Sequence, residues 1–293
     1  MVGGAATSSI RALATAGLVG AVSPDCIYVL DPAAPSAFSA SNGVTVAVNG
    51  CAISVDSTSS SAASVIGGSK VSATAVDVVG GVSLSNGGTI TPVAVTGVTP
   101  VGDPFASLPA LTPGTCTQTG MYFPASNTAI PPGTYCGGIS VTNGVTGVTF
   151  TAGDYIILGG GLNFAGGTTS SGSGVMFYLT GNLTYLYGSV NMSNGANVTL
   201  SAPTSGTYLG VLFFQNRSIV SLLPATFTGG ATMLLTGSLY FPTTDVSFSN
   251  GTATTAYTAI VADEVSFTGG ASINYDNTGL KTGLFSKSVA LVQ

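Results

Sequence analysis

The stretch VSFSNG at residues 246–251 alternates apolar with small polar side chains and ends in a pair that readily adopts positive φ. A near-copy, VSFTGG, follows at residues 265–270. Alternation with a period of two indicates a strand with one buried face, and Asn-Gly or Gly-Gly indicates a turn. Related phrases occur at residues 82–87, 139–144, 162–167, 190–195 and 225–230. The chain is therefore predicted to repeat one unit, a short strand followed by a corner.

From residue 139 onward the phrase returns every ~19 to 35 residues, a spacing typical of solenoids and propellers. We predict an all-β chain that forms a right-handed parallel β-helix (solenoid) over residues 26–293, with coils of about 20 to 25 residues. A β-sandwich would place strands every ~8 to 12 residues. A propeller would need about 40 residues per blade. Both therefore fit the spacing less well.

Two segments interrupt this rhythm, and a third precedes it. Residues 91–134 are rich in proline, which cannot donate to an interior ladder, so we expect an excursion across the outside of the solenoid. A linker between two domains is the alternative. A smaller excursion is expected over residues 215–224. Residues 1–25 are expected to contain a short helix, begun by Ser8 or Ser9, that caps an open end of the solenoid.

Composition excludes several classes of protein. Only 5% of the 293 residues are charged, against about 25% in an average soluble domain, and the net charge is −5. The basic residues do not form the cluster that a nucleic-acid surface needs; they are Arg11, Lys70, Arg217, Lys281 and Lys287. The longest apolar run, residues 12–22, is shorter than the ~20 residues of a membrane-spanning helix. It could instead be the core of a weak signal peptide.

The four cysteines, Cys26, Cys51, Cys116 and Cys136, contain no CxxC pair, and the chain has no histidine to complete a zinc site. An even number of cysteines in a chain with an exported composition favours disulfides over buried thiols. We predict the pairs Cys26–Cys51 and Cys116–Cys136, because each pair is separated by about one coil. Stacked strands lie about 4.8 Å apart, within the Cα separation that a disulfide accepts.

The sequences CIYVLDP at residues 26–32 and VTVAVNGC at residues 44–51 resemble the C-terminal region of TadG-like proteins. These belong to the TadE/TadG class associated with the tight-adherence (Flp) pilus. Further similar pieces lie at residues 98–105, 132–139, 200–208 and 237–242, so the resemblance runs from about Ala12 to the C-terminus. It implies an exported or cell-surface domain with a β-helical body, and it carries over no catalytic residue. TadG-like proteins usually begin with a pilin-like membrane segment, and no such segment is recognised here.

The acidic residues give no sign of an active site. Hydrolysis or elimination on polysaccharides needs clustered acids or a base beside a cation. Only Asp263 and Glu264 adjoin, and consecutive strand residues face opposite sides. The remaining acids are scattered: Asp25, Asp31, Asp56, Asp77, Asp103, Asp154, Asp245 and Asp276. We therefore expect no enzyme and no catalytic, cofactor or metal site.

Two functions remain from the sequence. The first is a structural component of an extracellular or cell-surface appendage, either pilus-associated or a subunit that self-associates into a fibre or homo-oligomer. Other pilus or envelope components are possible partners. The second is a surface adhesin or carbohydrate-binding module, for which Tyr185 and Tyr187 are the candidate outward-facing aromatic residues. Alternatively, Tyr185 and Tyr187 are ordinary strand residues with no role in binding.

Overall fold

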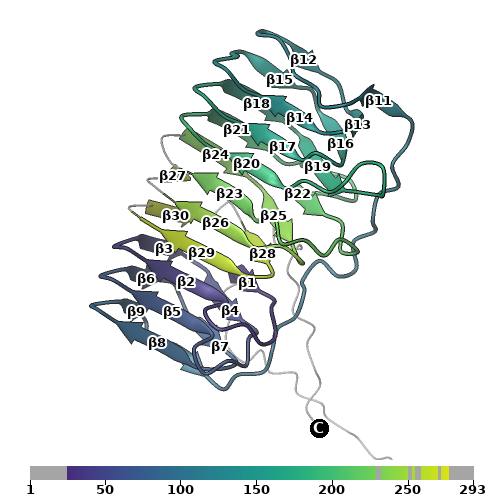
Figure 1. Ribbon diagram of the computed structural model, residues 1–293. Coiled ribbons are helices and arrows are strands. Elements are labelled where there is room, and N and C mark those ends of the chain that lie inside the picture. The colour runs from purple at the N-terminus through teal and green to yellow at the C-terminus, as the bar shows by residue number, and fades with distance from the viewer. Residues whose placement is uncertain (1–24, 229–231, 250–252, 255–258, 270–271, 277–293) are drawn as a thin grey trace, which may run out of the picture.

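The computed structural model describes residues 25–228, 232–249, 253–254, 259–269 and 272–276. These residues contain thirty strands, β1 to β30, and no helix. All strand pairs between them are parallel, and the chain visits three sheets in rotation, so that one circuit forms one coil (Figure 1). The all-β, parallel part of the prediction is confirmed. The helical cap expected over residues 1–25 lies almost wholly outside the described residues.

The three sheets are named here by their strands, in spatial order. Sheet A contains β10 (Val95–Thr96), β7 (Val76–Val78), β4 (Ala52–Val55), β1 (Asp25–Val29), β28 (Ile260–Ala262), β25 (Ser238–Phe241), β22 (Val211–Gln215), β19 (Val175–Thr180), β16 (Gly153–Leu158), β13 (Gly133–Cys136) and β11 (Cys116–Thr119). Sheet B contains β14 (Ile139–Val141), β17 (Leu162–Phe164), β20 (Val190–Met192), β23 (Ala225–Thr228), β26 (Val246–Ser249), β29 (Val265–Thr268), β2 (Phe38–Ser41), β5 (Ala63–Ile66) and β8 (Val82–Ser85). Sheet C contains β12 (Ala129–Ile130), β15 (Val148–Phe150), β18 (Thr169–Ser173), β21 (Asn197–Ser201), β24 (Thr232–Thr236), β27 (Ala253–Thr254), β30 (Ser272–Asp276), β3 (Thr45–Asn49), β6 (Lys70–Ser72) and β9 (Thr89–Thr91).

The coils are not stacked in chain order. The first strand, β1, lies between β28 and β4, in the interior of sheet A. The contact of β1 with β28 is called the joint here, and the whole stack of coils is called the column. An N-terminal block, residues 25–96, runs from the joint to one end of the column. The chain then crosses to the other end, begins again at β11, and returns as a C-terminal block, residues 116–276 (Figure 1). The last coil therefore docks on the first.

The crossing segment is shorter than the sequence predicts. It covers residues 97–115 rather than 91–134, because β10 still pairs with β7 and β11 already pairs with β13. Prolines after residue 115, such as Pro124 and Pro132, lie between the short strands of the first coil of the C-terminal block. They avoid interior ladder positions, so they do not prevent coil formation.

Coil length varies more than the predicted 20 to 25 residues. Facing side chains on neighbouring strands are 23 residues apart for Ser140 and Asn163, but 28 for Asn163 and Asn191 and 35 for Asn191 and Thr226. The longer coils carry extra loops at residues 181–189, 202–210 and 216–224. The last of these confirms the second predicted excursion.

The turn residues adopt the conformation that the repeated phrase predicts. Asn86, Asn143 and Asn194 have φ of 48°, 59° and 51°, each followed by a glycine with positive φ. Asparagine tolerates this left-handed region better than other side chains. These pairs therefore end the strands of sheet B and turn the chain toward sheet C.

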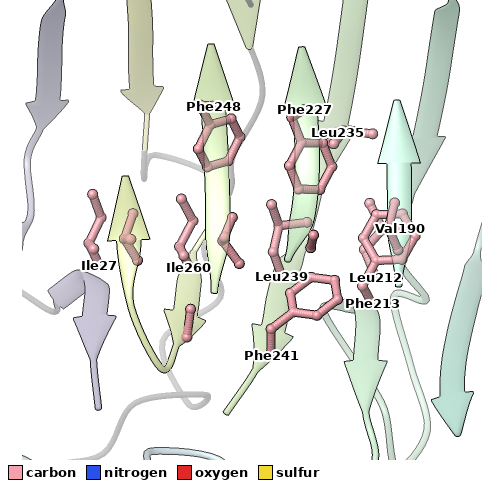
Figure 2. Close-up of a cluster of buried hydrophobic side chains, with 14 of the residues drawn as sticks. Ile27, Val190, Leu212, Phe213, Phe227, Leu235, Leu239, Phe241, Phe248 and Ile260 are labelled. Atoms are coloured by element: carbon pink, nitrogen blue, oxygen red, sulfur yellow. The ribbon is translucent and has the colours of Figure 1, made fainter. Parts of the chain in front are cut away.

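A single cluster of buried apolar side chains extends through both blocks. Each strand of sheet B contributes apolar residues two apart, and like residues stack along the column. Phe248 lies 5.0 Å from Phe227 and 5.3 Å from Phe267 between ring centroids, and all three rings are nearly parallel. Figure 2 shows Phe227 and Phe248 side by side on neighbouring strands. Across the joint, Phe267 is followed in register by Ala40. The core is thus continuous across the joint, although the residues on its two sides lie far apart in the sequence.

Candidate interaction surfaces

Both predicted disulfides are formed. Cys26 is bonded to Cys51 with a Cα separation of 5.7 Å, and Cys116 to Cys136 with 5.6 Å. The first bond joins neighbouring coils of the N-terminal block, and the second ties β11 to β13 at the start of the C-terminal block. Each block therefore carries one cross-link between adjacent coils.

The outer face of sheet B carries an uncharged polar file. One outward position on each of its nine strands holds a serine, threonine or asparagine, paired in register along the column. The file consists of Ser140, Asn163, Asn191, Thr226, Ser247, Ser266, Ser39, Ser64 and Ser83. On every strand except β8 their side chains alternate with buried apolar residues.

Part of this file is linked by hydrogen bonds. The amide of Asn163 donates to Ser140 Oγ at 3.1 Å, and the amide of Asn191 donates to Asn163 Oδ1 at 2.6 Å. Thr226 Oγ1 then donates to Asn191 Oδ1 at 2.8 Å. Such a ladder holds the side chains in fixed orientations, so sheet B presents an ordered array of amide and hydroxyl groups.

The outer face of sheet A is instead apolar, and the crossing segment covers it. Phe105 is 2% exposed and packs edge-on against Tyr240, with ring centroids 5.3 Å apart. Other members of this cluster are Tyr28, Met176, Tyr178, Val211, Phe214 and Val261. Residues 97–115 therefore act as a strap that buries one side of the column.

Polar contacts fasten the strap along its length. Asp56 accepts the backbone N–H groups of Val101 and Gly102 at 2.9 and 2.8 Å. Tyr208 Oη donates to Pro109 O at 3.0 Å, and Gly114 N donates to Thr134 Oγ1 at 3.2 Å. The strap thus contacts both blocks.

Arg217 forms the central fastening. Its guanidinium donates to the carbonyl oxygens of Phe105 and Leu108, and it lies 3.5 Å from Asp103. Tyr240 Oη accepts from Arg217 Nε and donates to Asp103 Oδ2 at 2.6 Å. Burial, followed by the bond to Asp103, raises the pKa of Tyr240. No sequence pattern predicts this role for Arg217.

Four carboxylates meet at one corner between sheets A and B, contrary to the expectation that the acids are scattered. Asp245 and the pair Asp263–Glu264 lie in the turns before β26 and β29, and Asp31 follows β1. Burial, then repulsion from Asp31 and Asp245, raises the pKa of Asp263 to about 6. Burial, then repulsion from Asp245, Asp31 and Asp263, raises that of Glu264 to about 7.

Sequence reasoning placed Asp263 and Glu264 on a strand, whereas they lie in a turn and need not face opposite sides. A signal for the cluster was present. Asp245 and Glu264 each directly precede a Val-Ser-Phe phrase, so they occupy the same position in neighbouring coils. The corner can take up protons near neutral pH, but among the described residues no group of three or more His, Cys, Asp and Glu could hold a metal ion.

Two loops of the C-terminal block expose apolar side chains. Leu183 and Leu222 are 100% and 98% exposed, and Leu186 is 73% exposed. The loop at residues 216–224 is attached to the turn that carries Asp245, because Thr243 Oγ1 donates to the carbonyl oxygen of Ile219. An apolar projection and an acidic corner therefore lie side by side.

The two tyrosines proposed for ligand stacking lie in the loop at residues 181–189 rather than on a strand. Tyr187 packs against the main core, and Tyr185 is only partly exposed. They do not form an outward aromatic pair. The polar file of sheet B offers a different surface for the same class of function.

The two ends of the column differ. At the β11–β12 end, Ile130 is fully buried, and the rings of Tyr122, Tyr135 and Tyr155 follow one another at centroid distances of 5.8 and 6.2 Å. At the β8–β9–β10 end, Leu84 is 52% exposed although it points into the core. A hollow of about 380 Å³ opens there, lined by Val82, Leu84, Ile90, Val93, Ala94 and Thr96.

In the part of the chain that the structure describes, no helix is long and apolar enough to cross a membrane. Comparison with known proteins found no matching family model, no matching curated protein and no matching solved structure.

Proposed function

We propose that this chain is a right-handed parallel β-helix that serves as a non-enzymatic structural subunit of an extracellular or cell-surface appendage. The observation that carries the proposal is the continuous column, in which rows of buried apolar side chains run through both blocks and across the joint. A core of this kind makes a stiff rod, because each coil is held by its neighbours over all three sheets. The two disulfides favour an oxidising compartment.

The uncharged side faces support self-association. Sheets usually carry lysine or other charges where contact between molecules must be prevented. The outward file of sheet B carries none over nine strands. The file itself therefore adds no charge repulsion when two columns approach side by side. The resemblance to TadG-like proteins adds a pilus-associated setting to this proposal.

Electron microscopy and light scattering of the full chain test it. We expect rods that associate as the protein concentration rises, and we expect Ser247→Lys with Ser266→Lys, in the middle of sheet B, to reduce this association. Ser72→Lys, on the exposed face of sheet C, is the matched control. A monodisperse monomer at every concentration would contradict the proposal.

A second candidate is an adhesive module that binds a neutral glycan on sheet B. The linked array Ser140–Asn163–Asn191–Thr226 favours it, because fixed amides and hydroxyls suit sugar hydroxyl groups. A glycan array probed with the native chain and with Asn163→Ala/Asn191→Ala separates the two. Binding that the double variant loses supports adhesion, whereas the absence of any glycan signal leaves the structural function.

A further inference from the structure

Five stretches of the chain match Asn-x-Ser/Thr, with x not proline, which is the acceptor motif for N-linked glycans. In a chain this rich in serine and threonine, the motif alone selects none of them. They begin at Asn182, Asn191, Asn197, Asn216 and Asn250. The first four lie among the described residues and can be compared, whereas residues 250–252 lie outside them.

A transferase that acts on a folded protein has to reach the whole motif, including its middle residue. In two of the four motifs the middle residue lies in the core, since Met192 is fully buried and Val198 is 1% exposed. Their asparagines, Asn191 and Asn197, lie on β20 and β21, and both strands are paired on each side. These two motifs cannot leave the column without breaking a ladder of backbone hydrogen bonds.

A third motif, at residues 216–218, is held by its side chains. Its middle residue, Arg217, donates to the strap at the carbonyl oxygens of Phe105 and Leu108. Asn216 itself uses its amide, since Nδ2 donates to Thr180 Oγ1 at 2.9 Å. The nitrogen that would carry a sugar is therefore already engaged, and exposing this motif would release the strap.

The motif Asn182-Leu183-Thr184 differs from the other three in each of these respects. All three of its residues are exposed, and Leu183 is 100% exposed. They lie in the loop at residues 181–189, outside the strands. Asn182 Oδ1 accepts the backbone N–H groups of Thr184 and Tyr185 at 2.9 and 2.8 Å, whereas no group in the described part of the chain accepts from Asn182 Nδ2. The nitrogen that a sugar would join is thus accessible.

The base of this loop is fixed to the column, and its tip is a single turn. Leu186 O accepts from Gly160 N at 2.9 Å, and Tyr187 packs against the main core. Asn182 N donates to Tyr185 O at 2.9 Å, which closes the turn. A sugar added at Asn182 would therefore displace no strand and no core side chain.

We propose that Asn182 is an N-glycosylation site and that the sugar donor is a lipid-linked oligosaccharide. Asn182 Nδ2 forms a bond to the anomeric carbon of the first sugar. The bond from that carbon to the lipid diphosphate breaks, the diphosphate leaves with the bonding electrons, and one amide proton passes to a base of the transferase. The inference rests on the exported location in the proposed function, because this motif is modified in exported chains.

A glycan at this position has a consequence for assembly. It is bulky and hydrophilic, and it would cover Leu183 and the neighbouring Leu186, which are 100% and 73% exposed. Apolar side chains grouped on a surface otherwise promote contact between molecules. The glycan would keep this loop out of contacts between copies and leave the polar file of sheet B available for them.

Intact-mass measurement and peptide mapping of the chain purified from its natural source test the proposal. We expect a glycan on the peptide that contains Asn182 and none on those that contain Asn191 and Asn216. Asn182→Gln and Thr184→Ala, expressed in the same source, should each lose the glycan mass. Thr184→Ser is the matched control and should retain it, because serine also completes the motif. A native chain with both disulfides formed but no glycan at Asn182 would overturn the inference and leave the exported location standing. Free cysteines in the native chain would contradict the location and this inference with it.

Transfer to the purified, unglycosylated chain tests whether the fold selects the site. The probe is an oligosaccharyltransferase with a lipid-linked oligosaccharide, and the readout is the gain in mass of each motif peptide. The folded chain should gain a glycan at Asn182, whereas the reduced and alkylated chain should gain glycans at Asn191, Asn197 and Asn216 as well. Transfer to the folded chain at Asn197 in preference to Asn182 would overturn the proposal. Transfer to Asn182 only after unfolding would also overturn it.

Discussion

The N-terminal and C-terminal blocks have the same winding but different cores. Along one inner file of sheet B, the C-terminal block stacks Phe227, Phe248 and Phe267, whereas the N-terminal block continues the file with Ala40, Val65 and Leu84. The backbone ladder sets the ~4.8 Å pitch in both blocks. Aromatic rings stack at nearly this spacing, but small aliphatic side chains fit it equally well. Pitch and core composition are thus independent in this fold.

The blocks also differ at their free ends. The C-terminal block ends in tyrosines and a buried isoleucine, whereas the N-terminal block ends in a hollow with half-exposed Leu84. A coil can close itself only if it has large side chains that turn back over the core. The difference teaches that two blocks with the same ladder can end differently, because large side chains cover the core at one end and not at the other.

The largest expected effect breaks the aromatic file. Phe248→Ala removes a ring that is 1% exposed and stacks on two others, so the free energy of unfolding should fall by about 3 to 5 kcal/mol. Ile53→Val in the N-terminal block removes one buried methyl group and should cost about 1 kcal/mol. Urea unfolding measures both. A loss for Phe248→Ala no larger than that for Ile53→Val would show that the stacked ring contributes no more than one buried methyl group.

The next effect tests the cross-links. The two disulfides close loops of similar length, with separations of 25 and 20 residues, so loss of either should cost about 3 kcal/mol in the loop-entropy account. Urea unfolding of Cys26→Ser/Cys51→Ser and of Cys116→Ser/Cys136→Ser compares them. A much larger loss for one pair would mean that its disulfide stabilises the folded block by more than loop closure predicts.

The strap offers a smaller effect. Arg217→Met removes the ion pair with Asp103 and the guanidinium donors to the carbonyl oxygens of Phe105 and Leu108, at a cost of about 2 kcal/mol. We expect faster proteolysis within residues 97–115 and little change in the sheets. Lys70→Met, on the exposed face of β6, is the control. An unchanged cleavage rate would show that apolar packing alone holds the strap.

The smallest effect lies at the joint between the blocks, where Asp31 meets Asp245, Asp263 and Glu264. Because the pKa of Asp263 is raised to about 6 and that of Glu264 to about 7, the folded state binds more protons than the unfolded state from about pH 4 to pH 7. The free energy of unfolding should therefore fall as pH rises through this window. The change should be about 1 kcal/mol, since these side chains are partly exposed and solvent screens them.

Melting temperatures measured at about pH 5 and pH 7 test this pH dependence. Asp263→Asn/Glu264→Gln should remove most of the difference between the two values. Asp77→Asn, which is remote from the joint on β7, should retain it. If the double variant keeps the full pH dependence, the acidic corner is not its source.

The pattern of residues predicted much of this structure. Alternation in phrases such as residues 246–251 located strands of sheet B, and the Asn-Gly pairs located their turns, because both depend on local backbone preference. The cysteine spacing predicted both disulfides, since it matches the length of a coil. The acidic corner was missed, because its members come from three coils and only the stack brings them together.

The sequence by itself determined the strands of sheet B, their Asn-Gly corners and the cross-links, and it predicted the parallel pairing. Only the tertiary structure decided the order of the coils, with β1 inserted between β28 and β4 and the strap on sheet A. The reason is that a parallel ladder joins backbones, and Ile27 packs on Ile260 as readily as on Ile53. Each coil presents the same backbone edge and an apolar inner face to any neighbour. Which coils become neighbours therefore depends on how whole blocks pack and on the strap that connects their ends. A local sequence pattern contains no information on either.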